Sequence, residues 1–334
     1  MLRCARLKSR LFTFTLIALT LLPAWASFGE TLTFRDKIGR TVTIQTPVKR
    51  AILLTGADLL PVTGSWKQVV GISRTAREDN DLLRAVKPDV AQLFPSVGDN
   101  SNFNIEMLLQ LKPDMVLSWS SNPANIHYMD KKGLPVVAVY PESITELYEV
   151  MRLQGKLFGR EKQVESAIFR MEEIFNFIRK RVAAVPPSQR KTALWISSKP
   201  TSVTGGISVN NDLLSIVGQN NLGQGIKEHS TDVPLEQIMS WNPDVIYIWG
   251  RASYSVNDIL NNPQWRYIKA VKERRVFKAP KWDTWSPRLA PLALWMAATV
   301  YPKQFSDIDV TKTIDKFYRN VYGIPYSKVT QIER

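Results

Sequence analysis

The spacing of apolar residues changes from helical to strand character twice, in two segments that repeat one another. In residues 105–117, IEMLLQLKPDMVL, apolar side chains first recur every three or four positions, and a Pro-Asp pair then precedes a continuous apolar run. Residues 235–247, LEQIMSWNPDVIY, repeat this order at an offset of 130 positions. Each segment therefore predicts a helix that leads into a buried strand, which is half of a parallel α/β unit.

Further short apolar runs surround each repeat and extend the prediction to two sheets. Because one helix and strand unit falls in each half of the chain, we expect the α/β fold class, with two three-layer α/β/α lobes. The predicted strands lie at 32–34, 41–44, 50–54, 69–72, 115–117 and 136–139 in the first half, and at 191–196, 245–248 and 275–278 in the second.

The most regular helical pattern lies between the two halves. From residue 162 to residue 182 the apolar positions alternate by three and four, with charged residues on the opposite face, and Pro186 and Pro187 end the pattern. We expect a single long helix that joins the lobes; the alternative is a surface helix of the first lobe. The predicted organisation is a signal peptide at 1–26, an N-terminal lobe at 27–143, an inter-lobe region with the connecting helix at 144–187, and a C-terminal lobe at 188–334.

The first 26 residues have the pattern of a cleavable signal peptide. Four basic residues precede an apolar run at 11–22, and the small-x-small triplet that signal peptidase reads follows at 24–26. A run of roughly twelve residues is too short to cross a bilayer of about 30 Å, which argues against a membrane anchor. The only cysteine, Cys4, precedes the run, so it is not the acylated cysteine of a lipoprotein. We expect a mature chain that starts near Ser27 in the periplasm and has no thiol chemistry.

Composition and motifs exclude several classes of function. The chain carries a net charge of +14, which favours anionic ligands or an acidic partner surface, although solvated lysine-rich surfaces account for most such charge. Basic and aromatic residues do not alternate in a nucleic-acid pattern, so no nucleic-acid partner is expected. The two histidines, His127 and His229, lie about 100 residues apart, and no G-x-S-x-G or H-x-x-x-H motif is present. We therefore expect a protein that is not an enzyme and has no intrinsic cofactor.

These features together resemble a known family. The paired E-x-x-x-x-x-x-P-D units, the TPVKRAILL opening at 46–54 and the WDTWSPRLAPLALWM segment at 282–296 are similar to those of class III periplasmic substrate-binding proteins of ABC importers. That resemblance implies a monomer that holds a metal chelate in a cleft between its lobes. It also implies that Glu106 and Glu236 dock onto arginines of the permease dimer. Each glutamate alone can instead be read as a residue that stabilises a helix start.

Loops at the carboxyl ends of strands line the cleft of such proteins, and these loops supply the candidate ligand residues. They are rich in tryptophan and arginine, which predicts an aromatic and cationic cleft that suits an anionic chelate. For Trp195 and Trp249 the alternative is core packing. The candidates that we favour are Trp119, Arg251, Trp282, Trp285 and Arg288, with Arg74 and Tyr254 as further contacts.

His229 is the candidate metal ligand. Catecholate siderophore binders carry an iron-ligating histidine and a charge-neutralising arginine in positions that look like His229 and Arg251, and imidazole suits ferric iron that a chelator leaves open. The alternative is an ordinary loop histidine. The chain departs from that pattern because Trp282 and Trp285 stand where a tyrosine is usual and because arginines of the first lobe are missing, with Arg74 and Arg77 as possible replacements.

A ferric siderophore is therefore the ligand that we expect first. Cobalamin, haem and a small oxyanion such as molybdate also occur in the family, and a cleft with more tryptophan and less positive charge favours cobalamin or haem. A periplasmic sensor module is the remaining class, but a sensor does not need the two matched glutamates.

Overall fold

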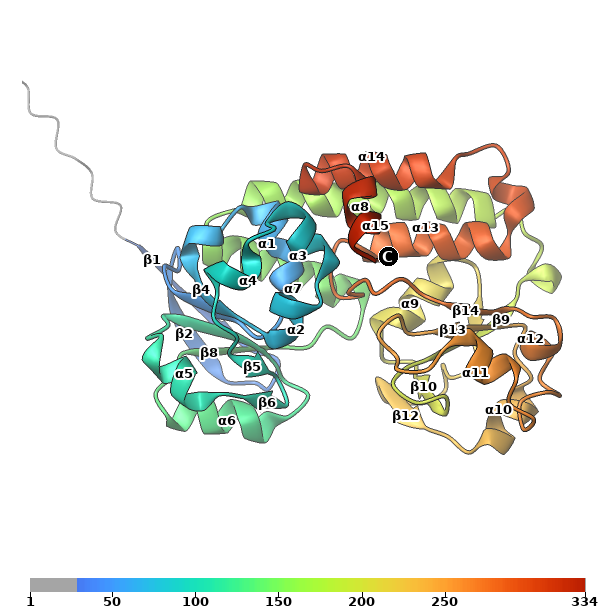
Figure 1. Cartoon of the computed structure of the whole chain (residues 1–334), viewed down its shortest axis with the longest axis horizontal. Coiled ribbons are helices and arrows are strands. Elements are labelled where there is room, and N and C mark those ends of the chain that lie inside the picture. Colours follow the sequence, from blue (N-terminus) through green and yellow to red (C-terminus); the bar gives the residue numbers. More distant parts are fainter. Residues whose placement is uncertain (1–28, 334) are drawn as a thin grey trace, which may run out of the picture.

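The protein forms two α/β lobes, as a computed structural model of residues 29–333 shows (Figure 1). The predicted signal peptide lies outside the described residues and stays a prediction. None of the helices between residues 29 and 333 combines the length and apolarity that crossing a membrane requires. The lobes lie side by side beneath the long helix α8.

The first lobe is built on a parallel sheet of four strands in the order β4-β3-β7-β8. One face packs against α5 and α6 and the other against α7, so the lobe has three layers. An antiparallel hairpin, β1 with β2, precedes the sheet. The elements of this lobe are β1 Glu30–Arg35, β2 Thr41–Thr46, β3 Ala51–Leu53, α1 Leu60–Thr63, β4 Val69–Ile72, α2 Arg74–Glu78, α3 Asp81–Val86, α4 Val90–Leu93, β5 Gly98–Asp99, β6 Asn102–Phe103, α5 Ile105–Gln110, β7 Met115–Trp119, α6 Pro123–Lys131, β8 Val136–Val139 and α7 Ile144–Phe158.

The second lobe has a mixed sheet in the order β12-β10-β9-β13-β14, with β11 also paired to β9. The central strands β9, β13 and β14 are parallel, and alternate residues of β13 face opposite layers: Val245 and Tyr247 face one core, while Ile246 and Ile248 face the other. The elements are β9 Thr192–Ile196, β10 Ser202–Thr204, α9 Val209–Ile216, β11 Asn220–Asn221, β12 Ser230–Asp232, α10 Leu235–Trp241, β13 Val245–Ile248, α11 Val256–Leu260, α12 Lys269–Lys272, β14 Val276–Lys278, α13 Leu289–Val300, α14 Val310–Tyr322 and α15 Tyr326–Glu333.

The repeated Pro-Asp pairs have the same structural role in both lobes. The Asp114 carboxylate accepts hydrogen bonds from the backbone N–H groups of Lys49, at 2.7 Å, and Arg50, at 2.9 Å. In the second lobe the Asp244 carboxylate accepts one from the N–H of Thr192 at 2.9 Å. Each aspartate thus ties the strand of its repeat to the start of the neighbouring parallel strand, β3 in the first lobe and β9 in the second.

Helix α8 (Glu161–Val182) is the predicted connecting helix, and it begins within one residue of the expected position. Its apolar stripe is buried, and it packs against α7 of the first lobe and against α13 and α9 of the second. A helix of 22 residues without proline resists bending, because kinks usually arise at proline or at a local defect. The two lobes are therefore joined by a stiff element.

The last two helices return to the first lobe. Within the range predicted for the C-terminal lobe, residues 188–334, α15 packs against α3 and α14 contacts α1. The aromatic side chains of α14, Phe317, Tyr318 and Tyr322, are buried. The lobes are thus connected by α8 and also by the chain's final segment.

Candidate functional site

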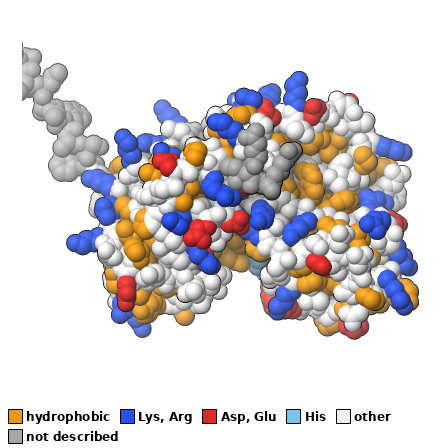
Figure 2. Space-filling view, in the orientation of Figure 1, with side chains coloured by type: hydrophobic (Ala, Val, Ile, Leu, Met, Phe, Trp, Pro, Cys, Tyr) orange, Lys and Arg blue, Asp and Glu red, His pale blue; other side chains and the backbone are white. Residues whose placement is uncertain are grey.

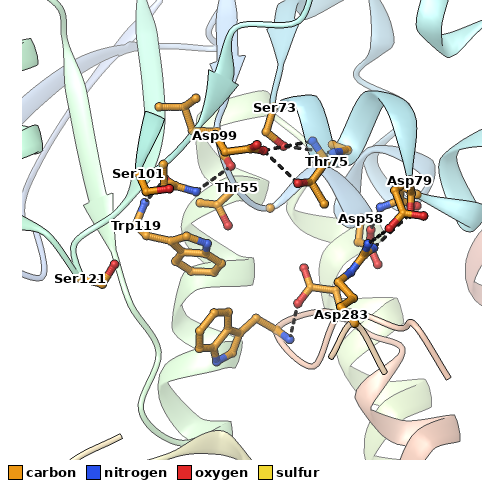
Figure 3. Close-up of a pocket in the computed structure, with 18 of the residues that line it drawn as sticks. Thr55, Asp58, Ser73, Thr75, Asp79, Asp99, Ser101, Trp119, Ser121 and Asp283 are labelled. Carbon is orange, nitrogen blue, oxygen red and sulfur yellow. Dashed lines mark hydrogen bonds and ion pairs between the residues drawn. The ribbon is translucent and has the colours of Figure 1, made fainter. Parts of the chain in front are cut away.

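A cavity of about 630 Å³ lies between the lobes, at the carboxyl ends of the central strands (Figure 3). This volume falls within the range of small-molecule sites, and the position is the one at which open α/β sheets bind ligands. The first lobe contributes many small polar side chains, and the second contributes tryptophan and charged residues. The lining includes Thr55, Asp58, Ser73, Thr75, Asp79, Asn80, Asp99, Asn100, Ser101, Trp119, Ser121 and Asn122 from the first lobe, and Trp249, Arg251, Trp282, Asp283 and Trp285 from the second.

Aromatic rings from both lobes meet beside this cavity. The ring centroids of Trp119 and Trp285 are 4.4 Å apart, and Tyr140 lies 5.3 Å from Trp285. His229 completes the group, at 5.3 Å from Tyr140 and 5.4 Å from Trp285. We call these four residues the aromatic cluster. Of the four residues, Trp119 and Trp285 line the cavity, and their tilted rings form an apolar wall at the junction of the lobes.

Two polar atoms of the aromatic cluster are buried without a hydrogen-bond partner in the described chain. They are Nε1 of Trp285 and Nε2 of His229. Burial lowers the pKa of His229, against the opposing charge of Glu142, so the ring is neutral at physiological pH. Buried polar groups normally have partners, so these two nitrogens are candidates for contact with a ligand or water. His229 itself contacts the Trp285 ring and is not part of the cavity lining.

The arginines near the cavity are already paired. Arg251 donates to an Asp79 carboxylate oxygen at 2.6 Å, across the boundary between the lobes. Arg74, which is largely exposed, donates to Asp99 at 2.8 Å. We predicted a cleft that is both aromatic and cationic. The cavity is aromatic, but it is not cationic, because its lining holds four carboxylates and a single guanidinium.

The position of Arg288 differs from the prediction that this residue contacts the ligand. Its side chain is fully buried, it does not line the cavity, and it joins the lobes through Asp58, at 3.1 Å, and Asp81, at 2.7 Å. A guanidinium at this depth needs carboxylate partners, and the first lobe supplies two. We call Arg288, Asp58 and Asp81 the buried ion triad; it holds the lobes together and leaves Arg288 no contact with a ligand in the cavity.

Asp283 is a carboxylate that the sequence did not draw attention to. It follows Trp282 and accepts a hydrogen bond from the backbone N–H of Trp285 at 2.9 Å. Burial and the nearby charge of Asp58 raise the pKa of Asp283 to about 6. The group therefore titrates close to neutral pH and has a readily altered charge.

The remaining candidates are placed as follows. Trp119, Trp282, Trp285 and Arg251 line the cavity, although Trp282 is only 2% exposed and also packs against Tyr318. The Tyr254 hydroxyl donates to the carbonyl of Ser197 outside the lining. Trp195 is a core residue, whereas Trp249 reaches the cavity. Sequence reasoning sought aromatic and basic residues and so missed the polar ones. The rule of strand ends could have found Ser73, which follows β4 of the parallel sheet.

Glu106 and Glu236 occupy matching places, as the second residues of α5 and α10. Both are exposed, and within residues 29–333 neither forms an ion pair. The side chain of Asn104 caps α5, so Glu106 is not needed for that purpose. One turn after each glutamate stands an exposed apolar residue, Leu109 or Met239, with about 40% of its surface accessible. Figure 1 places α5 and α10 in the lower half of the two lobes, away from α8.

The sequence signature described as periplasmic binding protein matches residues 51–281. The chain belongs to this family. It is 26% identical over 320 residues to the molybdate-binding protein MolA of Haemophilus influenzae, which covers 87% of this chain and 91% of that protein. It is 24% identical over 260 residues to the Fe(3+)-citrate-binding protein YfmC of Bacillus subtilis, with 75% and 78% covered.

Among solved structures, Helicobacter pylori CeuE in a nickel–histidine complex superposes with a TM-score of 0.82 and 27% identity, over 91% of this chain and 99% of that one. The two-lobed α/β fold is thereby confirmed. The family consists of binding proteins of ABC transporters, so this chain is a substrate-binding protein, and no described feature indicates catalysis.

Proposed function

We propose that the chain delivers a small metal complex of neutral or positive charge to an ABC importer, and that it holds this complex in the cavity between its lobes. The charge pattern of the cavity carries the proposal. Each arginine next to the cavity is bound to a carboxylate, so an anionic ligand would have to displace Asp79 from Arg251 or Asp99 from Arg74. Leaving either carboxylate unpaired costs free energy that a neutral or cationic complex does not require.

The size and walls of the cavity support a chelate over a simple ion. A volume of about 630 Å³ is far larger than a four-oxygen oxyanion needs. Indole faces such as those of Trp119 and Trp285 bind flat or bulky ligand surfaces. The small hydroxyl and amide side chains of the first lobe can donate to and accept from the periphery of a chelate.

The names of the relatives cover several metal-containing ligands: molybdate, ferric citrate and vitamin B12, with a nickel–histidine complex in the structural relative. Our first expectation from the sequence, a ferric siderophore, fits this cavity when the chelate is neutral or cationic. Hydroxamate chelates meet that condition. A ferric tris-catecholate carries three negative charges and does not.

We further propose that the protein is exported to the periplasm as a monomer and docks on its permease through Glu106 and Glu236. The exposed Leu109 and Met239 support this proposal, because each adds an apolar contact beside a carboxylate on both lobes. Two such surfaces at matched positions suit a partner with two-fold symmetry and basic sockets.

Tryptophan fluorescence tests the ligand class, because Trp119 and Trp285 line the cavity. Purified protein is titrated with nickel–histidine, a cationic ferric hydroxamate, a ferric tris-catecholate, ferric citrate, haem, cobalamin and molybdate. We expect quenching by the neutral and cationic complexes at lower concentration than by the anionic ones. Preferential binding of molybdate or of the tris-catecholate would contradict the proposal.

Single substitutions locate the quenched tryptophans. Trp119→Phe and Trp285→Phe should each reduce the ligand-dependent change. Trp265→Phe is the matched control, because Trp265 is 3% exposed within the outer core of the second lobe and lies away from the cavity. An equal loss in all three variants would show that the signal does not come from this cavity.

A further inference from the structure

The cavity holds one carboxylate without a basic partner. Within residues 29–333 each of the other three acidic side chains that line it forms an ion pair, whereas Asp283 forms none. The pairs are Asp58 with Arg288, Asp79 with Arg251, and Asp99 with Arg74. The charge of Asp283 is therefore the one that the protein leaves unmatched.

The surroundings of Asp283 make this charge costly. Three charged groups act on it, namely Asp58, which repels it, and Arg251 and Arg288, which attract it. Both arginines are committed to other carboxylates. Burial and the Asp58 charge raise the pKa of Asp283 to about 6, so at pH 7 the group is mostly ionised in a site where ionisation is unfavourable. A cation placed beside it would relieve that cost.

The neighbouring rings also favour a cation. The side chain of Asp283 points into the cavity on the side of the Trp119 ring (Figure 3). The indole of Trp119 lies against that of Trp285, with centroids 4.4 Å apart. Indole faces attract cations through their quadrupole, and the attraction grows when the cation leaves water. Asp283 and the indoles of Trp119 and Trp285 line the same cavity, and together they can bind a cation.

We propose that Asp283, with the rings of Trp119 and Trp285, binds a positively charged group of the ligand, such as a protonated amine on the periphery of a metal chelate. This inference rests on the proposed function and deepens it, since it names a chemical group that the transported complex carries. Asp283 is then the residue that distinguishes charged from uncharged members of one chelate class.

A substitution can separate the structural role of Asp283 from the role of its charge in binding. Its carboxylate accepts from the N–H of Trp285 and so supports the turn before α13. Asp283→Asn keeps one acceptor oxygen for this hydrogen bond and removes the negative charge, with an amide NH2 group in place of the second oxygen. Thermal unfolding of this variant checks that the fold is intact before any binding measurement.

The experiment compares two ligands of nearly equal size. One is a ferric trihydroxamate with a free primary amine, which is protonated at pH 7, and the other is the same compound with the amine acetylated. We expect the parent protein to bind the amine form at least tenfold more tightly, as a charge-assisted hydrogen bond predicts. Asp283→Asn should bind both forms alike, at the affinity of the parent for the acetylated form. Lowering the pH from 7.5 to 5 should weaken amine binding in the parent only.

The possible results distinguish failure of the cation site at Asp283 from failure of the proposed function, which is binding of a neutral or cationic metal complex. Equal affinity of the parent for both forms, or a preference for the amine that survives in Asp283→Asn, refutes the role of Asp283 while metal-complex binding stands. Failure of both forms to bind at millimolar concentration, together with binding of an anionic complex, refutes the cation site and the proposed function. Failure of both forms alongside binding of nickel–histidine refutes the cation site for chelates of this class.

Discussion

Replacing Arg288 by methionine should destabilise the protein strongly. The guanidinium is fully buried and donates to Asp58 and Asp81, whose side chains are 2% and 6% exposed. Methionine fills much of the same volume but leaves two buried carboxylates without a cation. Removing one partner of a buried ion pair costs about 3–5 kcal/mol, which is a large part of a typical folding free energy of about 5–15 kcal/mol.

Thermal and urea unfolding of the ligand-free protein measure this effect. An unfolding entropy of about 2.1 cal/mol/K per residue corresponds to roughly 1.5 °C per kcal/mol for a chain of this size, so the midpoint should fall by about 5–8 °C. Arg319→Met is the matched control, because Arg319 also donates to an aspartate, Asp315 at 2.6 Å, but its side chain is 59% exposed. Exposed pairs contribute about 0–1 kcal/mol.

A loss below about 1 kcal/mol in Arg288→Met, equal to that of the control, would show that the buried ion triad does not hold the lobes together. Combining Arg288→Met with Asp58→Asn and Asp81→Asn should restore part of the stability, because no buried charge is then left unpaired. No recovery in the triple variant would point to lost packing around Arg288 as the cause.

Three further predictions address docking, pH dependence and movement. Reversing both charges with Glu106→Lys and Glu236→Lys should leave ligand affinity unchanged and abolish uptake by cells, since like charges at an interface cost several kcal/mol; Glu161→Lys, in the first turn of α8, is the control, and normal uptake by the double variant would remove the docking role. Because the folded-state pKa of Asp283 is raised to about 6, the folded protein binds an extra proton between the ordinary value of 3.8 and 6. Asp283 therefore contributes a component of stability that is lost as pH rises from 4 to 7, and the Asp283→Asn variant should lack this component; identical pH profiles of unfolding in the two proteins would contradict it. Small-angle scattering with and without bound ligand should nearly superimpose, because α8 and α15 both restrain the lobes; a marked decrease in radius of gyration would show a flexible hinge.

The fold was predictable where local pattern and burial coincide. The apolar residues of α8, from Val164 to Val182, recur with helical spacing along one face of the helix. This face is buried, as the spacing predicts. The repeats around Asp114 and Asp244 combine helix, turn and strand signals within a few residues. Such short-range patterns require no knowledge of distant parts of the chain.

The chemistry of the cavity was less predictable, because it depends on pairing between distant residues. Arg288 has the type and position of a ligand residue, but its partners Asp58 and Asp81 lie more than 200 residues earlier. The charge of Arg251 is likewise compensated by Asp79, 172 residues away. Composition reports how many charges a chain carries but not which of them are already matched. Figure 2 shows that Lys and Arg side chains are spread over the visible face of both lobes.

The return of α15 to the first lobe determines the order in which the molecule can be completed. Helix α3 lies near residue 80, and the helix that covers it ends at Glu333. Val329 of α15 is fully buried, so this contact forms a genuine part of the interior. During synthesis of the chain, this surface of the first lobe stays uncovered until α15 has been made. The N-terminal lobe is therefore synthesised before the helix that covers part of its surface. Removing α15 would leave α3 of that lobe uncovered.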